Sequence, residues 1–304
     1  MIAFLTRRDA AMLLKKLSFI ILCVFYYLIS LELAFGLDHG LLWQIESPNG
    51  KISKVFGTMH LIDKDMNILF NHISHHIKQS RIVFIEYTLD KNDSSSISGK
   101  LVNTNRAIET RLSNKELHAL KKFLKSNNIP FNFLKNASPS LIYGYLINPK
   151  SINNLPIDFM IGDFAVEQNI PVQGLEPARE VFERMLILDD SFFSQALKNT
   201  LSHVNLLPSY RKKMKSLYFN EDLIGIINSL TIPEISPKIN NNYMKSLINE
   251  RNLNMFHRAQ HELDLGDAFI AVGAAHLGGE QGLLNLLKKA GYKIFRHDIA
   301  ITLS

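Results

Sequence analysis

The chain has 304 residues, of which 46% are hydrophobic and 20% are charged, a composition typical of a globular protein with a full hydrophobic core. Its 34 basic residues outnumber 28 acidic ones, giving a formal net charge of +6. Beyond residue 36 there is no long Lys/Arg run and no interleaving of basic and aromatic residues. The composition therefore argues against nucleic acid as a partner.

Residues 1–36 have the pattern of a secretory signal peptide. Lys15 and Lys16 precede an uncharged apolar run at 17–31, and Ala34 and Gly36 supply the small residues of a cleavage site after Gly36. The alternative is an uncleaved membrane anchor through residues 17–35, which reach a marginal spanning length. We expect an exported domain over 37–304, periplasmic or secreted after cleavage, or otherwise membrane-anchored.

Cys23 is the only cysteine, and it lies inside this apolar run. A cleaved protein would contain no cysteine, which excludes disulfides and thiolate chemistry. Any metal ion would then need His, Asp or Glu ligands.

The rest of the chain alternates between strand and helix signals. Two strands joined by a turn at 47–50 form an expected hairpin, and a helix follows His60. Ser113 with Glu116 fits a capping box, and Ser138 before Pro139 fits a helix start. The strands are expected at 41–45, 51–56, 81–87, 171–175, 268–272 and 292–295, and the helical segments at 113–125, after Ser138, at 156–168, 178–230, 241–265 and 280–290, with a polar loop at 90–100.

The order strand, Gly-x-x-His, helix, strand therefore occurs near both ends of the chain. Between the two copies lies a mainly helical stretch without a convincing linker. We predict an α/β fold with a central mixed β-sheet built from two similar halves, and a largely helical insert between them, in one domain.

Gly57-x-x-His60 and Gly273-x-x-His276 are the two copies of that motif. A Gly directly after a strand allows a sharp turn, and the His then lies at the carboxyl end of the strand, where ligands gather in open α/β sheets. Each motif alone is weak, since a lone His there is usually a hydrogen-bonded structural residue. The repeated context predicts one site built from both ends of the fold.

Two carboxylates follow other apolar strands. Glu86 ends the strand at 81–87, where a buried charge is costly unless it is paired, although it could also point to solvent. Two imidazoles and one carboxylate suit a divalent metal that keeps positions open for water. Such an ion lowers the pKa of water and makes a nucleophile near neutral pH. Glu176 is either a support for this site or a carboxylate at a helix N-terminus.

Other basic side chains are candidates of lower rank. Arg251, beside Asn252 at an expected helix start, could bind a substrate carboxylate or stabilise an oxyanion, or could be a surface arginine. Helical spacing also places further histidines on common faces, but without the His-Glu-x-x-His order we expect solvated faces for them. They are His72, His75, His76, His257 and His261.

The motifs together resemble the TraB/GumN family, which includes the TIKI proteases. The resemblance covers residues 42–295, and its motifs are Val55-Phe56-Gly57-Thr58-Met59-His60, Ile85-Glu86, Gly174-Leu175-Glu176, Arg251-Asn252 and Val272-Gly273-Ala274-Ala275-His276-Leu277. One departure is Pro177, where the family commonly has Thr, which puts a role for that position in doubt.

The resemblance implies a fold related to the erythromycin-esterase and ChaN-like proteins, and a divalent-metal site at His60, Glu86 and His276. It also implies a metal ion such as Mn, Co or Zn. Family members include a metal-dependent peptidase that trims secreted signalling proteins, a pheromone-shutdown protein and proteins tied to polysaccharide clusters.

We therefore expect an exported metal-dependent hydrolase, with a peptidase as the leading hypothesis. Its substrate would be a peptide or a small molecule, and its catalytic residues would be His60, Glu86, Arg251 and His276, with Glu86 as ligand or general base. One alternative is a non-catalytic protein of the same fold that binds a metal, haem or a small ligand. A second is a structural or partner-binding membrane protein in which the histidines only pack.

Overall fold

The computed structural model describes residues 36–60, 65–88, 99–102, 104, 106–148 and 156–299. The predicted signal segment and most of the polar loop at 90–100 lie outside these residues. Within the described part, no helix is both long and apolar enough to span a membrane.

A six-stranded mixed sheet forms the centre of the fold, in the order β4-β3-β5-β2-β1-β6. Only β1 runs antiparallel to its neighbours, so the other five strands point the same way. The strands are β1 Leu42–Glu46, β2 Ile52–Thr58, β3 Ile82–Thr88, β4 Val172–Pro177, β5 Ala268–Gly273 and β6 Lys293–His297. The predicted α/β class and mixed sheet are confirmed.

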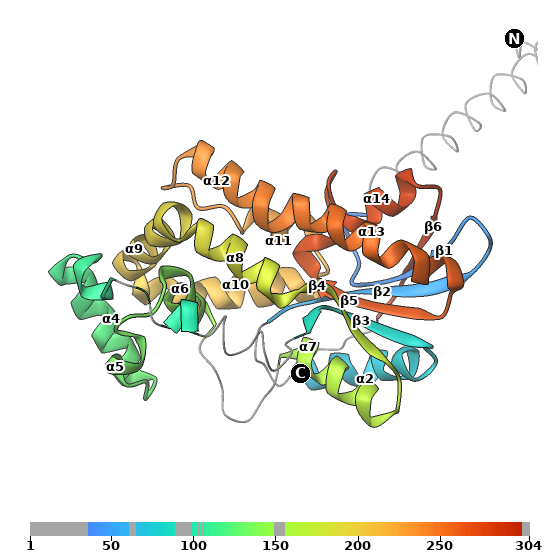
Figure 1. Ribbon diagram of the computed structural model, residues 1–304, viewed down its shortest axis with the longest axis horizontal. Coiled ribbons are helices and arrows are strands. Elements are labelled where there is room, and N and C mark those ends of the chain that lie inside the picture. The colour runs from blue at the N-terminus through green and yellow to red at the C-terminus, as the bar shows by residue number, and fades with distance from the viewer. Residues whose placement is uncertain are drawn as a thin grey trace, which may run out of the picture.

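Helices cover both faces of this sheet. Helices α2 Asp65–Lys78 and α7 Ile157–Glu167 lie on one side, and α13 Glu250–Leu265 and α14 Leu283–Lys289 lie on the other (Figure 1). The connection from β2 through α2 to β3 and the connection from β5 through α14 to β6 therefore use opposite faces. When the connections of two adjacent parallel strands leave on opposite faces of the sheet, a crevice forms at the carboxyl ends of those strands. This is where α/β proteins bind ligands.

The helical insert extends away from the sheet at the left of Figure 1 and has a small core of its own, which includes Leu120, Leu134 and Leu197. The predicted caps of Ser113 and Ser138 are confirmed. The expected segment 178–230 is several helices, since a π-helical turn at Asp189–Phe193, Pro208 and a left-handed Glu221 interrupt it. The helices of the insert are α4 Asn114–Ser126, α5 Phe131–Leu134, α6 Pro139–Ile147, α8 Ala178–Ile187, α9 Ser194–Ser202, α10 Leu207–Phe219, α11 Leu223–Asn228 and α12 Pro237–Met244.

Strand order explains why the two motifs meet. Strands β2 and β5 are direct neighbours in parallel register, with Thr58 opposite Gly273. Strand β3 pairs with the other edge of β5, and β4 follows β3 with Glu176 opposite Tyr87. Four strand ends therefore present the motif residues along one edge of the sheet.

The two motif glycines act by close approach; the expected sharp turn follows Gly273, which leads directly into a 3-10 turn at Ala274–His276, but not Gly57, because β2 continues to Thr58. Neither has a positive φ, and Gly57 lies inside β2. A Cβ added at Gly57 would lie 2.8 Å from Leu277 Cδ1 and 3.2 Å from Ala274 Cα. The missing side chain thus lets the second motif pack directly on the first strand.

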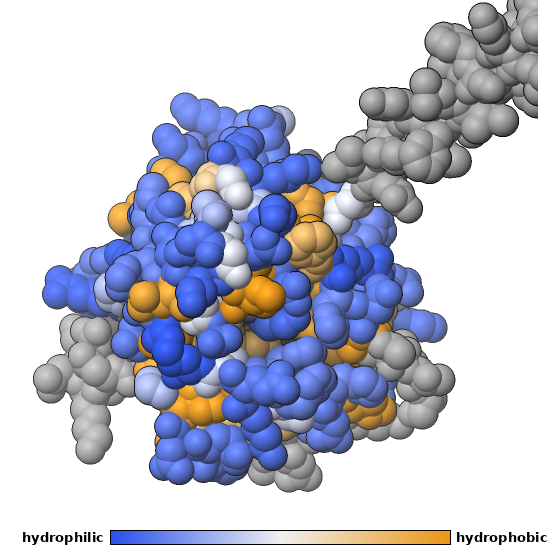
Figure 2. Space-filling model, turned by 90° about the vertical axis from the view of Figure 1, so that its right-hand side faces the viewer, coloured by the Kyte–Doolittle hydropathy of each residue, from blue (hydrophilic) through white to orange (hydrophobic). Residues whose placement is uncertain are grey.

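The face of the molecule at the β1–β6 end is mostly hydrophilic, with small separate apolar patches (Figure 2). Buried apolar residues on both sides of the sheet instead form the main core, among them Trp43, Phe56 and Phe269. The rings of Phe56 and Phe269 lie 6.3 Å apart on neighbouring strands.

Core packing at the motif strands gives the first prediction. Phe56→Ala should lower the free energy of unfolding by about 3–5 kcal/mol, because a fully buried phenyl ring leaves a cavity that the sheet cannot close. Phe133→Ala is the control: that ring is 54% exposed, and its loss should change stability by less than about 0.5 kcal/mol. Urea unfolding followed by circular dichroism measures both, and equal losses would contradict the assignment of the core.

Candidate functional site

A buried arginine connects two strand ends. Arg251 Nε donates to Glu176 Oε2 at 2.7 Å, and its Nη2 donates to Glu86 Oε2 at 2.9 Å. All three side chains are almost fully shielded from solvent. Because an unpaired buried charge is very unfavourable, each carboxylate depends on this guanidinium. The surface alternative for Arg251 is wrong.

The helix that carries Arg251 is longer than expected. Helix α12, a π-helical turn at Lys245–Asn249 and α13 follow one another without a break, so Arg251 lies inside a long helix and not at its start. Helix α13 packs against β4 and β5, which brings Arg251 over their carboxyl ends. Such π-turns are often found at functional sites, because they rotate the following side chains relative to a regular helix.

Glu86 is an ionised carboxylate with one hydrogen bond at each oxygen. Its Oε1 accepts a hydrogen bond of 2.6 Å from the backbone N–H of Gly273, and a Cβ at Gly273 would lie 2.8 Å from that oxygen. Burial favours the protonated form, but the adjacent Arg251 guanidinium, with smaller contributions from the imidazoles of His276 and His60, outweighs it and lowers the pKa of Glu86 below its usual range. The alternative in which Glu86 points to solvent is wrong.

His276 is buried and held in one tautomer. Its Nδ1 lies 2.6 Å from Oδ1 of Asn252, whose amide nitrogen donates to the carbonyl of Gln281. That second bond fixes the Asn252 oxygen toward the imidazole, so Nδ1 carries the hydrogen and Nε2 has the lone pair. Burial lowers the pKa of His276 to about 4, helped by the charge of Arg251, and the ring is neutral at physiological pH.

The lone pair of His276 Nε2 faces the charged residues and accepts a long hydrogen bond from Arg251. Nε2 lies 3.3 Å from Arg251 Nη1 and 3.9 Å from Glu86 Oε1. An imidazole nitrogen and a carboxylate oxygen therefore share one small space beside the guanidinium.

His60 is the outer histidine, with a side chain that is 56% exposed. Its Nδ1 lies 2.8 Å from Oδ2 of Asp158 in the first turn of α7, and its backbone carbonyl accepts a hydrogen bond from the side-chain amide of Asn148. The negative charge of Asp158 raises the pKa of His60 to about 9, against the effects of burial and of Arg251. His60 is therefore a cation at neutral pH.

The predicted residues share one electrostatic site but do not form a ready-made cage. The charge of His60 lowers the pKa of both Glu86 and His276. Among the residues that the structure describes, however, no three His, Cys, Asp or Glu side chains are arranged to hold a metal ion. Glu86 and His276 lie close together, while the imidazole of His60 is turned toward Asp158.

Glu176 supports the site and does not cap a helix, because Pro177 occupies the cap position of α8. Its side chain is buried against Arg251, and its Oε1 has no hydrogen-bond partner among the described residues. Burial raises the pKa of Glu176 despite the adjacent guanidinium.

The other histidines are mostly solvated, as predicted, since His72, His75, His257 and His261 are exposed. His76 is the exception: it is buried between His75 and His297, with ring centroids 3.7 Å and 4.8 Å away. The prediction is wrong there because β6 closes over the end of α2 and covers one face of it.

The sequence did not reveal Asp158 or Asn148 as partners of His60. Asp158 carried one usable signal, an acidic residue in the first turn of an expected helix, where the helix dipole favours a negative charge. No local sequence pattern predicts that Asp158 contacts His60, about a hundred positions earlier.

Comparison with known proteins identifies a family. The family model of the TraB/PrgY/gumN family matches residues 41–296, which include every motif described above. No curated protein and no solved structure gives a significant match.

Removing the Arg251 guanidinium should leave the buried carboxylates of Glu86 and Glu176 without their ion-pair partner. Arg251→Met should lower the free energy of unfolding by about 3–5 kcal/mol at neutral pH. Without Arg251, burial raises the pKa of Glu86 and Glu176 above their unfolded values, so the folded variant binds more protons than the unfolded chain. Its stability should therefore fall as pH rises through those values, and the variant should be more stable at pH 5 than at pH 8.

Arg258→Met is the matched control for this variant. Arg258 lies on the same helix, is 39% exposed, pairs with Glu180 at the surface and donates to the Leu175 carbonyl at 3.0 Å, so its loss should cost about 1–2 kcal/mol, less than the loss of Arg251. Denaturant titrations at both pH values measure the difference. A pH-independent Arg251→Met stability equal to that of Arg258→Met would contradict the buried network.

The two site histidines should titrate in opposite directions. Histidine resonances followed by NMR should place the pKa of His60 at about 9 and that of His276 at about 4. In Asp158→Asn the pKa of His60 should fall toward 6.5, its ordinary value. Because the native pKa is raised, the stabilisation from this pair is complete below pH 6.5 and is lost as pH rises through about 9. A His60 pKa near 6.5 in the unmodified protein would refute the Asp158 pair.

Proposed function

The chain belongs to the TraB/PrgY/gumN family, and on that premise we propose that it is an exported metal-dependent hydrolase, with peptides as its substrates. His60, Glu86 and His276 would hold the divalent ion, such as Mn, Co or Zn. The observation that supports this most is the fixed tautomer of His276, whose Nε2 lone pair lies 3.9 Å from an ionised carboxylate oxygen.

The spacing of these two atoms suits a shared cation. Ligand atoms bonded to one ion at about 2.0–2.2 Å in a tetrahedral site lie about 3.5 Å apart, so a small movement would suffice. The Nδ1–H of His276 donates a hydrogen bond to Asn252. Metal-binding imidazoles are usually oriented by such a bond from the ring nitrogen that does not bind the metal. Glu86 Oε1 still has a free lone pair after it accepts the bond from Gly273.

His60, on the exposed side of the site, resembles His276 in having one ring nitrogen held by a neighbouring side chain. Asp158 engages Nδ1, so Nε2 is the atom that would face an ion, as in carboxylate–histidine–metal triads. Because a ligand imidazole must be neutral, binding would release the proton that Asp158 stabilises.

Charge balance also favours a cation. Glu86 and Glu176 share one guanidinium, so one buried carboxylate is only partly neutralised. Burial raises the pKa of Glu176, and its Oε1 has no hydrogen-bond partner among the described residues. An added cation beside Glu86 would relieve this charge imbalance.

The bound ion would supply Lewis acidity and a nucleophile derived from water at neutral pH. The chain's own residues provide the rest of the mechanism. Arg251 Nη1 makes only long contacts, 3.4 Å to the Leu247 carbonyl and 3.3 Å to His276, so it is the donor that can turn to a substrate carbonyl and stabilise an oxyanion. Glu86, with its lowered pKa, is a weak base and suits the ligand role better than the general-base role.

Metal analysis with matched histidine variants tests the proposal. The purified protein should hold about one divalent ion, and His60→Ala and His276→Ala should each lose both the ion and peptide hydrolysis. Asn252→Leu, which removes the orienting oxygen together with the amide donor to the Gln281 carbonyl, should weaken metal affinity by about 10–100-fold. His257→Ala and His261→Ala are the controls, because both rings are exposed on α13, and they should change neither readout.

An ion that stays unchanged in both His60→Ala and His276→Ala would sink the assignment. Tight metal binding without turnover of a broad peptide and ester panel would instead favour the non-catalytic binding protein.

A further inference from the structure

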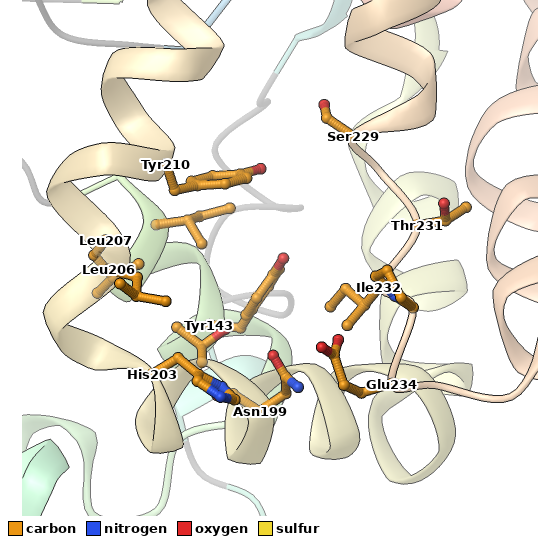
Figure 3. A pocket seen from close by; sticks show the side chains of 13 residues that line it. Tyr143, Asn199, His203, Leu206, Leu207, Tyr210, Ser229, Thr231, Ile232 and Glu234 are labelled. Atoms are coloured by element: carbon orange, nitrogen blue, oxygen red, sulfur yellow. The ribbon is translucent and has the colours of Figure 1, made fainter.

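A pocket of about 230 Å³ lies in the helical insert, outside the candidate site. Helices α6, α9 and α10 form one wall, and the segment after α11 forms the other (Figure 3). Its lining residues are Tyr143, Ile147, Asn199, Thr200, His203, Leu206, Leu207, Tyr210, Ser229, Thr231, Ile232, Pro233 and Glu234.

The lining mixes apolar and polar side chains and includes two unused phenol groups. Tyr143 on α6 and Tyr210 on α10 direct their hydroxyls into the open space toward the opposite wall (Figure 3). Neither hydroxyl has a hydrogen-bond partner within the described part of the chain. Burial raises the pKa of both, so both are neutral donors at physiological pH.

The charges of the lining restrict the ligand. No Lys or Arg lines the pocket, and Glu234 contributes a negative charge at one end. A carboxylate or phosphate group would find no Lys or Arg there, with His203 the one basic side chain of the lining, and burying it would be costly. Hydrocarbon together with two phenolic donors instead suits an uncharged group with a polar tip.

The pocket adjoins the candidate site through two connections. Ile147 lines the pocket, and the next residue, Asn148, donates to the backbone carbonyl of His60. On the other side, Tyr243 lies in the same run of helices as Arg251, eight residues earlier, about 12 Å along the axis. Phe193 links Tyr243 to the pocket, because its ring centroid lies 6.1 Å from that of Tyr143 and 6.0 Å from that of Tyr243.

We infer that this pocket is a substrate subsite that takes one bulky uncharged side chain, preferably the phenol of a tyrosine, from a peptide held across the candidate site. The inference rests on the proposed function for the identity of the substrate. A cavity of about 150 Å³ already accommodates benzene, so the volume here is sufficient for one aromatic side chain. The two hydroxyls would bond the phenol oxygen of the ligand.

Direct binding tests the subsite without relying on hydrolysis. Pentapeptide amides Gly-Gly-X-Gly-Gly, with X as Tyr, Phe, Gly or Glu, are titrated against the full-length protein in EDTA and followed by NMR. The Phe peptide should bind at least tenfold more tightly than the Gly and Glu peptides. The Tyr peptide should bind about three- to tenfold more tightly than the Phe peptide, because of its hydrogen bonds.

Matched variants locate the site. Asn199→Trp places an indole in the pocket and should abolish the preference for Tyr and Phe, whereas Lys198→Trp places the same group on the exposed side of α9 and should leave it intact. The double variant Tyr143→Phe, Tyr210→Phe should bind the Tyr and Phe peptides equally.

Two results would overturn the inference: equal binding of the Gly and Tyr peptides, or a Tyr preference that survives Asn199→Trp. His276→Ala separates this inference from the proposed function. It should abolish metal binding and hydrolysis but leave the peptide preference unchanged, so either conclusion can fail alone.

Discussion

One buried positive charge organises this protein. Arg251 is the only cation that contacts both Glu86 and Glu176 among the described residues, and both carboxylates are shielded from water. Burying charges is favourable only when each is paired and hydrogen-bonded. The long helix that carries Arg251 must therefore dock at one position over the strand ends, and the π-helical turn before it adjusts the direction of the side chain. The position of this helix is set by charge as much as by packing.

The need to pair these buried charges also constrains the sheet. Parallel pairing places the ends of β2, β5, β3 and β4 along one edge, and the absence of side chains at Gly57 and Gly273 lets the adjacent loops and the Glu86 carboxylate approach closely. A bond from the buried Tyr218 hydroxyl to the Gly57 carbonyl fixes the first motif from the opposite side. Backbone, glycine and carboxylate are thus interdependent, and a change in any one would disturb the others.

Local signals in the sequence were sufficient for most of the fold. Capping residues Ser113 and Ser138, the hairpin turn and the apolar strands before each motif predicted elements that the structure contains, and the strand ends predicted that His60, Glu86 and His276 belong together. The partners of these residues were not predictable. Asp158 meets His60, and Asn148 meets its carbonyl, only through the packing of α7 and α6 near β2. The breaks within 178–230 were only partly predictable, because Pro208 is a local signal whereas the π-helical turn at Asp189–Phe193 and the left-handed Glu221 are not.

His60 and His276 look equivalent in sequence, but their pKa values are shifted in opposite directions. His276 is buried, neutral and fixed by Asn252, whereas His60 is half exposed and protonated through Asp158. This difference follows from the topology: the second motif begins at the central strand beneath α13, while the first ends at the surface beside the helical insert. An inner, permanently oriented ligand and an outer one that must first give up a proton would make occupancy of the site depend on what approaches from the insert. The pocket beside Asn148 lies on that side of His60.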